Sequence, residues 1–171
     1  MEAAANRKAP TSRDQDLALK LGSMILLAFR GHAGDVVRVI DESGLSFVQT
    51  KALLALEGPG EGAGATVTGL AETLGVSPAS ASRAVDGLVR KRLASRLEDS
   101  ADRRVRRLAP TAKGRDLAER IMAARLAGIE EFAATLEPDE RRELESALET
   151  LLRRPELAEI YETYAKKAGP R

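Results

Sequence analysis

Residues 68–92 read TGLAETLGVSPASASRAVDGLVRKR. Thr68 is a candidate N-cap for a short helix, which ends at the tight turn supplied by Gly75. Ser77 is a candidate N-cap for a second helix that runs to the end of the stretch. Pro78 then takes the first helical position, where its missing N–H costs nothing. Two helices joined through a glycine turn predict a helix-turn-helix.

The second helix has two chemically different faces. One is an apolar stripe that must pack against the domain: Ala81, Val85, Leu88 and Val89. The other face carries Ala79, Ser82, Arg83, Asp86 and Arg90. Small residues let a backbone approach base edges, hydroxyls bond bases or phosphates, and Arg83 has the reach for guanine O6 and N7. Together with Ser77 and Ser80 at the helix N-terminus, this face predicts DNA contacts. The alternative is an ordinary amphipathic surface helix.

A hairpin is predicted directly after this helix. Residues 94–98 and 104–109 are β-capable, and the turn formers between them are Asp99, Ser100 and Asp102. A helix-turn-helix followed by a two-stranded ribbon is a winged helix. We expect Leu97 and Leu108 to anchor the strands. Several arginines are placed to reach a neighbouring minor groove: Arg103, Arg104 and Arg106.

Carboxylates lie beside these arginines, and two interpretations fit them. An adjacent carboxylate can hold an arginine extended and reduce the entropy lost on binding. Alternatively, the acids only limit nonspecific basicity. Residues 77–113 hold ten Lys/Arg and four Asp/Glu, which gives +6, whereas the chain as a whole carries +1. This local excess indicates an anionic partner or, alternatively, a salt-bridged surface.

The composition excludes several function classes. The 171 residues contain no cysteine and one histidine, which removes disulfides, thiolate metal sites and thiol nucleophiles. No pair of carboxylates converges, so we expect neither an enzyme nor a metal or cofactor. The glycine-rich stretch at 58–65 lacks the Gly-Lys-Ser/Thr of a phosphate loop and is interpreted as a connector. The most apolar stretch, residues 21–31, is too short to span a bilayer, and we expect no signal peptide because residues 1–16 are polar and lack an apolar run. These features predict a cytoplasmic protein without a membrane partner.

The remaining elements give the predicted organisation. Residues 1–13 form a disordered arm and residues 14–45 an N-terminal dimerisation helix, which the glycines of RGHAGD weaken or bend. Residues 46–113 form the winged helix-turn-helix DNA-binding domain, whose first helix, 47–57, is capped by Ser46 and offers Phe47 for packing. Residues 114–171 hold a long helix opened by Thr111, then helices that follow Pro138 and Pro155. The predicted fold class is mainly α with a small β wing.

Two stretches together resemble the MarR (multiple antibiotic resistance regulator) family: LAETLGVSPASASRAVDGLVRKRLASR, residues 70–96, and DSADRRVRRLAPTAKG, residues 99–114. The resemblance implies that residues 77–92 form the recognition helix. It also implies that Arg104 of the Asp-x-Arg element enters the minor groove and that Asp102 supports it. The family usually has Leu-Thr where this chain has Pro110-Thr111. Because proline cannot donate a ladder hydrogen bond, we expect the second strand to end by Ala109.

The resemblance further implies a homodimer joined through its N- and C-terminal helices. Such a dimer binds double-stranded DNA at a pseudo-palindromic operator and represses transcription. Many family members are released by small anionic aromatic ligands bound between the dimer and DNA-binding regions. The residues of such a site are not defined by this sequence; His32 lies near its expected place, but a lone histidine is more often structural or solvated. The alternative function is a winged-helix protein–protein adaptor that does not bind DNA.

Overall fold

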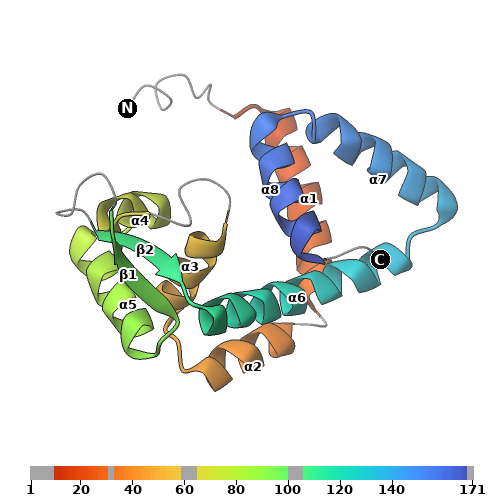
Figure 1. The fold of residues 1–171 in the computed structure, drawn as a ribbon. Helices are drawn as coiled ribbons and strands as arrows, with labels where there is room; N and C mark the ends of the chain where they lie inside the picture. Colours follow the sequence, from red (N-terminus) through yellow and green to blue (C-terminus); the bar gives the residue numbers. More distant parts are fainter. Residues whose placement is uncertain (1–9, 31–32, 59–64, 100–105, 169–171) are drawn as a thin grey trace.

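The computed structural model describes residues 10–30, 33–58, 65–99 and 106–168. Within these residues it has eight helices and one two-stranded antiparallel ribbon, so the predicted fold class is confirmed (Figure 1). The elements in chain order are α1 (Ser12–Arg30), α2 (Ala33–Ser43), α3 (Phe47–Glu57), α4 (Val67–Leu74), α5 (Pro78–Arg90), β1 (Ala94–Glu98), β2 (Arg106–Pro110), α6 (Ala112–Ala134), α7 (Pro138–Leu151) and α8 (Pro155–Ala168).

The N-terminal segment forms two helices where one bent helix was expected. α1 begins at Ser12 because Thr11 and Asp14 cap it reciprocally: the Thr11 N–H donates to Asp14 Oδ2 (2.7 Å), and the Asp14 N–H donates to Thr11 Oγ1 (3.3 Å). The backbone and then the side-chain hydrogen bond from Thr11 lower the pKa of Asp14. α1 ends at Arg30 and α2 starts at Ala33. Residues 1–9 of the predicted arm, and His32, lie outside the described residues.

The core joins α3, α4, α5, the ribbon and the first half of α6. Its fully buried side chains include Leu53, Leu56, Leu70, Val85, Leu88, Leu108 and Ile121. Ser46 starts α3 as predicted, through a capping box with Gln49. The prediction that Phe47 packs was wrong, because this first residue of α3 is 75% exposed.

The helix-turn-helix has the predicted turn but a different first cap. Gly75 ends α4 in the left-handed conformation at φ +65°. The cap of α4 is Thr66 and not Thr68, since Thr66 Oγ1 accepts a hydrogen bond from the Gly69 N–H at 3.1 Å. The helix therefore starts at Val67, whose side chain packs against the core. Ser77 and Pro78 open α5 as predicted.

The end of α5 turns the chain sharply into the wing. The Leu93 N–H donates to the Leu88 carbonyl and the Arg92 N–H donates to the Val89 carbonyl, both at 2.9 Å. This is the Schellman arrangement, in which the residue after the helix cap is left-handed and usually glycine. Here that residue is Arg92, at φ +60°. The turn ends the helix two residues before the predicted boundary.

The ribbon pairs Ala94 with Pro110 at its base and Glu98 with Arg106 at its far end. β1 has the predicted bounds, but β2 extends to Pro110, so the prediction that it ends by Ala109 was wrong. A proline at the terminal pair removes only one donor from a two-stranded ribbon. Residues 100–105, between the strands, lie outside the described residues. The predicted start of the second strand, residue 104, is among them.

Only one of the two predicted strand anchors is buried. Leu108 is fully buried, whereas Leu97 is 52% exposed. Leu97 pairs with Arg107 and Leu108 with Arg96 in the register. Because side chains alternate between the two faces of a ribbon, Leu97 lies on the face opposite to Leu108. The prediction for Leu97 was therefore wrong.

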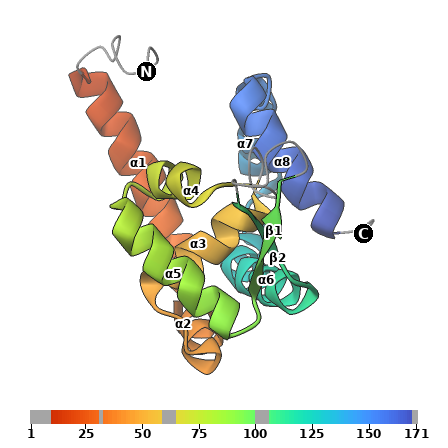
Figure 2. The ribbon, with the colours of Figure 1, turned by 60° about the vertical axis from the view of Figure 1, so that its left-hand side comes forward.

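The terminal helices extend away from this core. Thr111 caps α6 as predicted, accepting a hydrogen bond from the Gly114 N–H at 3.1 Å. α1 and α2 contact α6, and α7 and α8 continue from its far end (Figure 1). Figure 2 shows that α1 and the α7–α8 pair point away from the core on opposite sides. No helix within the described ranges is long and apolar enough to cross a membrane.

Candidate nucleic-acid interface

The N-terminal end of α5 presents a connected set of polar groups. Ser77 Oγ accepts a hydrogen bond from the Ser80 N–H (3.2 Å) and lies 3.1 Å from Ser80 Oγ. Arg83 Nη2 then donates to Ser80 Oγ at 3.1 Å. Ser77, Ala79 and Arg83 are exposed, while Ser80 and Ser82 are half-buried. The Arg83 guanidinium is thereby held beside the start of the helix, with further donors available to a ligand.

The opposite face of α5 fixes the helix to the core. Ala81, Val85 and Leu88 are fully buried, and Val89 is half-buried against them. The two faces predicted from the sequence are therefore present. An exposed helix with a rigidly packed rear face can enter a groove without rearranging.

The wing lies beside this exposed face and is tied to it by an ion pair. Arg96 Nη2 of β1 donates to Asp86 Oδ1 of α5 at 2.7 Å, and both side chains are about two-fifths exposed, at 38% and 41%. This pair was not predicted. The alternation of side chains along β1 was the sequence signal for this pair, because it places Arg96 on the face of the ribbon that also carries the buried Leu108.

Acids and arginines pair along the wing, as the orienting interpretation requires. Arg106 Nη1 lies 2.8 Å from Glu98 Oε1, directly across the ribbon, and Arg107 Nε lies 2.5 Å from Asp99 Oδ2. The Asp99 side chain is only 13% exposed, so that pair is partly shielded from solvent. The predicted pair of Asp102 with Arg104, and Arg103 beside it, lie outside the described residues.

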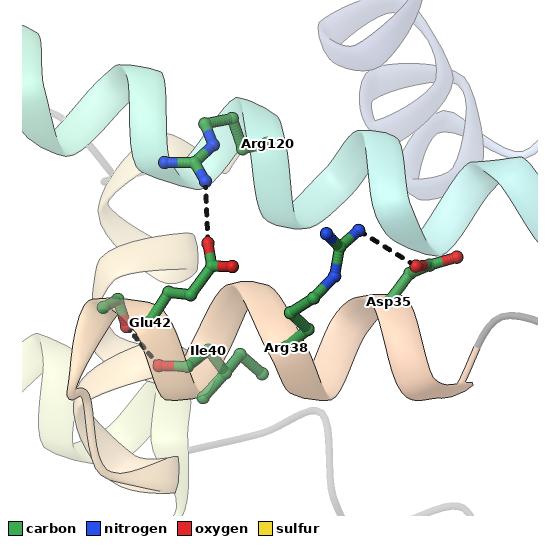
Figure 3. Close-up of polar contacts among 6 residues, drawn as sticks. Asp35, Arg38, Ile40, Glu42 and Arg120 are labelled. Carbon is green, nitrogen blue, oxygen red and sulfur yellow. Dashed lines mark hydrogen bonds and ion pairs between the residues drawn. The ribbon is translucent and has the colours of Figure 1, made fainter.

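A cleft of about 290 Å³ lies where α2, the end of α5 and the start of α6 meet. It is lined by Glu42, Ser43, Lys91, Leu93, Lys113, Asp116, Leu117 and Arg120. Lys91 Nζ donates to the Ser43 carbonyl at 3.3 Å. Figure 3 shows Arg120 of α6 pointing to Glu42 of α2, with Nη2 and Oε2 at 3.4 Å, while Arg38 pairs with Asp35 within α2. The cleft thus combines two leucines with three cationic side chains and two carboxylates, one of which pairs with Arg120.

Among the described residues, no three metal-ligating side chains lie close enough together to hold a metal ion.

The exposed face of α5, the adjacent ribbon and the basic charge together define a winged helix-turn-helix protein. A family model described as MarR family matches residues 43–105. The resemblance to the MarR family predicted from the sequence is thus confirmed for the winged-helix part of this chain.

Solved structures share the fold over most of the chain. RV1404 from Mycobacterium tuberculosis is 26% identical with a TM-score of 0.66, and the match covers 85% of this chain and 95% of that one. Transcriptional regulator Tm0710 from Thermotoga maritima is 21% identical with a TM-score of 0.64, covering 84% and 96%. MepR from S. aureus, solved with ethidium bromide, is 18% identical with a TM-score of 0.57, covering 81% and 94%. A comparison with curated protein sequences gave no match.

Proposed function

We propose that this protein is a sequence-specific, double-stranded DNA-binding repressor of transcription that acts as a homodimer. The observation that carries the proposal is the exposed face of α5, on which Ser80 holds the Arg83 guanidinium beside the helix N-terminus. An arginine placed in this way suits the O6 and N7 acceptors of guanine in the major groove. The +6 charge of residues 77–113 supplies the attraction to phosphate.

The wing supports a second contact. With α5 in the major groove, the ribbon at its side reaches along the duplex toward the minor groove. The two arginines at the start of β2, Arg106 and Arg107, are held by Glu98 and Asp99. Arginine is favoured in narrow minor grooves, where the negative potential is enhanced. We assign Arg103, Arg104 and Arg106 to this contact, together with Asp102 as the supporting acid.

Apolar side chains that the chain does not cover support the homodimer. Large exposed side chains on α1 are Leu17, Leu19, Leu21, Ile25, Leu26 and Leu27, and on α7 and α8 they are Leu148, Leu151, Leu157, Ile160 and Tyr161. α7 buries none of its residues within the chain. Two-fold pairing through these helices would cover both faces, and a dimer that reads two half-sites must hold its two copies of α5 one helical turn of DNA apart, about 34 Å. Two-fold symmetry in the protein implies a pseudo-palindromic operator.

A small-molecule effector is the third part of the proposal. In the cleft between α2, α5 and α6, the cations Lys91, Lys113 and Arg120 outnumber the two lining carboxylates, and this excess of positive charge suits an anionic ligand. Lys91 directly follows α5, so a ligand that drew its ammonium from the Ser43 carbonyl would alter how α5 is held. Benzoate and 2-hydroxybenzoate are suitable probes. Release of bound DNA by either probe, lost in Lys113→Gln, would support this site, and undiminished release in that variant would exclude it.

The experiment that tests DNA binding is selection of bound fragments from the genome that encodes the protein. The proposal predicts enrichment of a two-fold related sequence, which shifts in gel electrophoresis while a scrambled duplex of equal length does not. Equal binding to both duplexes would exclude a specific regulator. Complete lack of DNA binding by the folded dimer would favour the protein–protein adaptor.

A further inference from the structure

The Asp86 carboxylate lies among three arginines but pairs with only one of them in the structure. Arg83 precedes it by three residues on α5 and Arg90 follows it by four. Side chains three and four residues apart are neighbours on a helix surface, and opposite charges at these spacings normally attract. Asp86 instead pairs with Arg96, ten residues later on β1, at 2.7 Å.

The consequence for the two arginines on α5 is visible in their contacts. Arg83 donates to Ser80 Oγ at 3.1 Å, and neither Arg83 nor Arg90 forms an ion pair with another described residue. Both are exposed. The two strongest donors on this helix face therefore keep their charge available, although a carboxylate lies between them.

We infer that Arg96 is a specificity-determining positioning residue, which occupies the Asp86 carboxylate so that Arg83 and Arg90 remain available to DNA. Arg96 acts through Asp86 and needs no contact with bases itself. The inference rests on the proposed DNA-binding function and assigns the origin of its base discrimination. Without Arg96, Asp86 would turn to Arg83 or Arg90, and base reading would weaken.

A rescue experiment separates this role from a merely structural one. Arg96→Ala should reduce the preference for the selected duplex over single-base variants by about tenfold, within the range of one lost bidentate base contact. Asp86→Asn in the same chain removes the competing carboxylate while keeping its shape. The double variant should therefore recover most of the discrimination. If the pair only braced the wing against α5, Asp86→Asn could not restore what Arg96→Ala removed.

Controls keep the result interpretable. Arg96→Lys retains a cation at the carboxylate and should lose little discrimination. Arg38→Ala removes one positive charge from α2, where Arg38 pairs with Asp35, and should leave discrimination unchanged. Circular dichroism and thermal melting verify that each variant is folded.

Three outcomes count against the inference, in two different ways. Equal discrimination in Arg96→Ala and the wild type, or a double variant no better than Arg96→Ala, would overturn the role of Arg96 while leaving DNA binding in place. A wild type without preference for the selected duplex would overturn the proposed function and this inference with it.

Discussion

Gly114 of α6 lies directly against the carbonyl group of Leu93, so that a Cβ on Gly114 would come within 2.0 Å of the carbonyl oxygen. Gly114 is buried, and the oxygen belongs to the backbone and cannot move aside cheaply. The same Leu93 carbonyl accepts a hydrogen bond from the Thr111 N–H at 3.0 Å. The start of the long helix is thereby fixed to the turn between α5 and the wing.

Gly114→Ala should destabilise the fold strongly, because the backbone of α6 must move to relieve the clash. We expect the free energy of unfolding to fall by about 3 kcal/mol or more, which is the upper end of the range for overpacking. Urea unfolding followed by circular dichroism measures it. Gly34→Ala is the matched control, since a Cβ at Gly34 in α2 meets nothing within 4 Å. That control should be neutral or gain up to about 1 kcal/mol. Equal effects at the two sites would contradict the close approach.

Arg92→Gly should stabilise the protein. A non-glycine residue in the left-handed region costs roughly 1–2 kcal/mol, and the greater chain entropy of glycine offsets part of this gain. The expected net gain is about 0.5–1 kcal/mol in urea unfolding. Arg92→Ala separates charge from conformation, because alanine keeps the unfavourable φ of +60° and should give no such gain. A loss of stability in Arg92→Gly would show that the arginine side chain stabilises this turn.

The predicted dimer interface can be broken by one charge. Ile160→Asp on α8 places a carboxylate in the surface that pairing would bury, and an unpaired buried charge costs several kcal/mol. Sedimentation velocity at micromolar concentration should show a monomer. Phe47→Asp is the control, because Phe47 is equally apolar and 75% exposed but lies on α3. A dimeric Ile160→Asp, or a monomeric wild type, would argue against pairing through the terminal helices.

The roles of Arg104 in the minor groove and of Asp102 as its support stay predictions. Arg104→Ala should weaken specific binding and reduce the slope of log affinity against log salt by about one if a phosphate contact is also lost. Asp102→Ala separates two mechanisms by sign: the orienting model predicts weaker binding, whereas bulk charge control predicts tighter binding. Affinities of both single variants and the double variant, over a salt series, give the coupling. Tighter binding by Asp102→Ala with additive effects would reject the orienting role.

Sequence reasoning succeeded where the signal is local. The positions of Ser46, Ser77 and Thr111 at helix starts are predictable because a capping hydroxyl acts locally, on the backbone N–H three residues further on. Thr66 and Thr68 show the limit of this approach: both are threonines near the start of the same helix, but Thr66 is the cap and Thr68 lies in the first turn of α4.

Features that depend on tertiary packing were not predictable in this way. Leu97 and Leu108 are equally apolar, and only the strand register separates an exposed from a buried leucine. The pair of Asp86 with Arg96 requires the ribbon to fold back beside α5. In the candidate site, helical periodicity predicts which residues lie on the exposed face of α5. It does not predict which side chain each charged residue pairs with.

The most direct test of the account is base discrimination by Arg83→Ala. The affinity of wild type and variant is measured on the selected duplex and on every single-base variant of one half-site, over a salt series. The account predicts that Arg83→Ala loses roughly 1–3 kcal/mol per half-site and relaxes the preference at one definable base pair. A uniform weakening on all duplexes, with a reduced salt slope and unchanged base preference, would make Arg83 a phosphate contact and contradict the claim that α5 reads sequence through it.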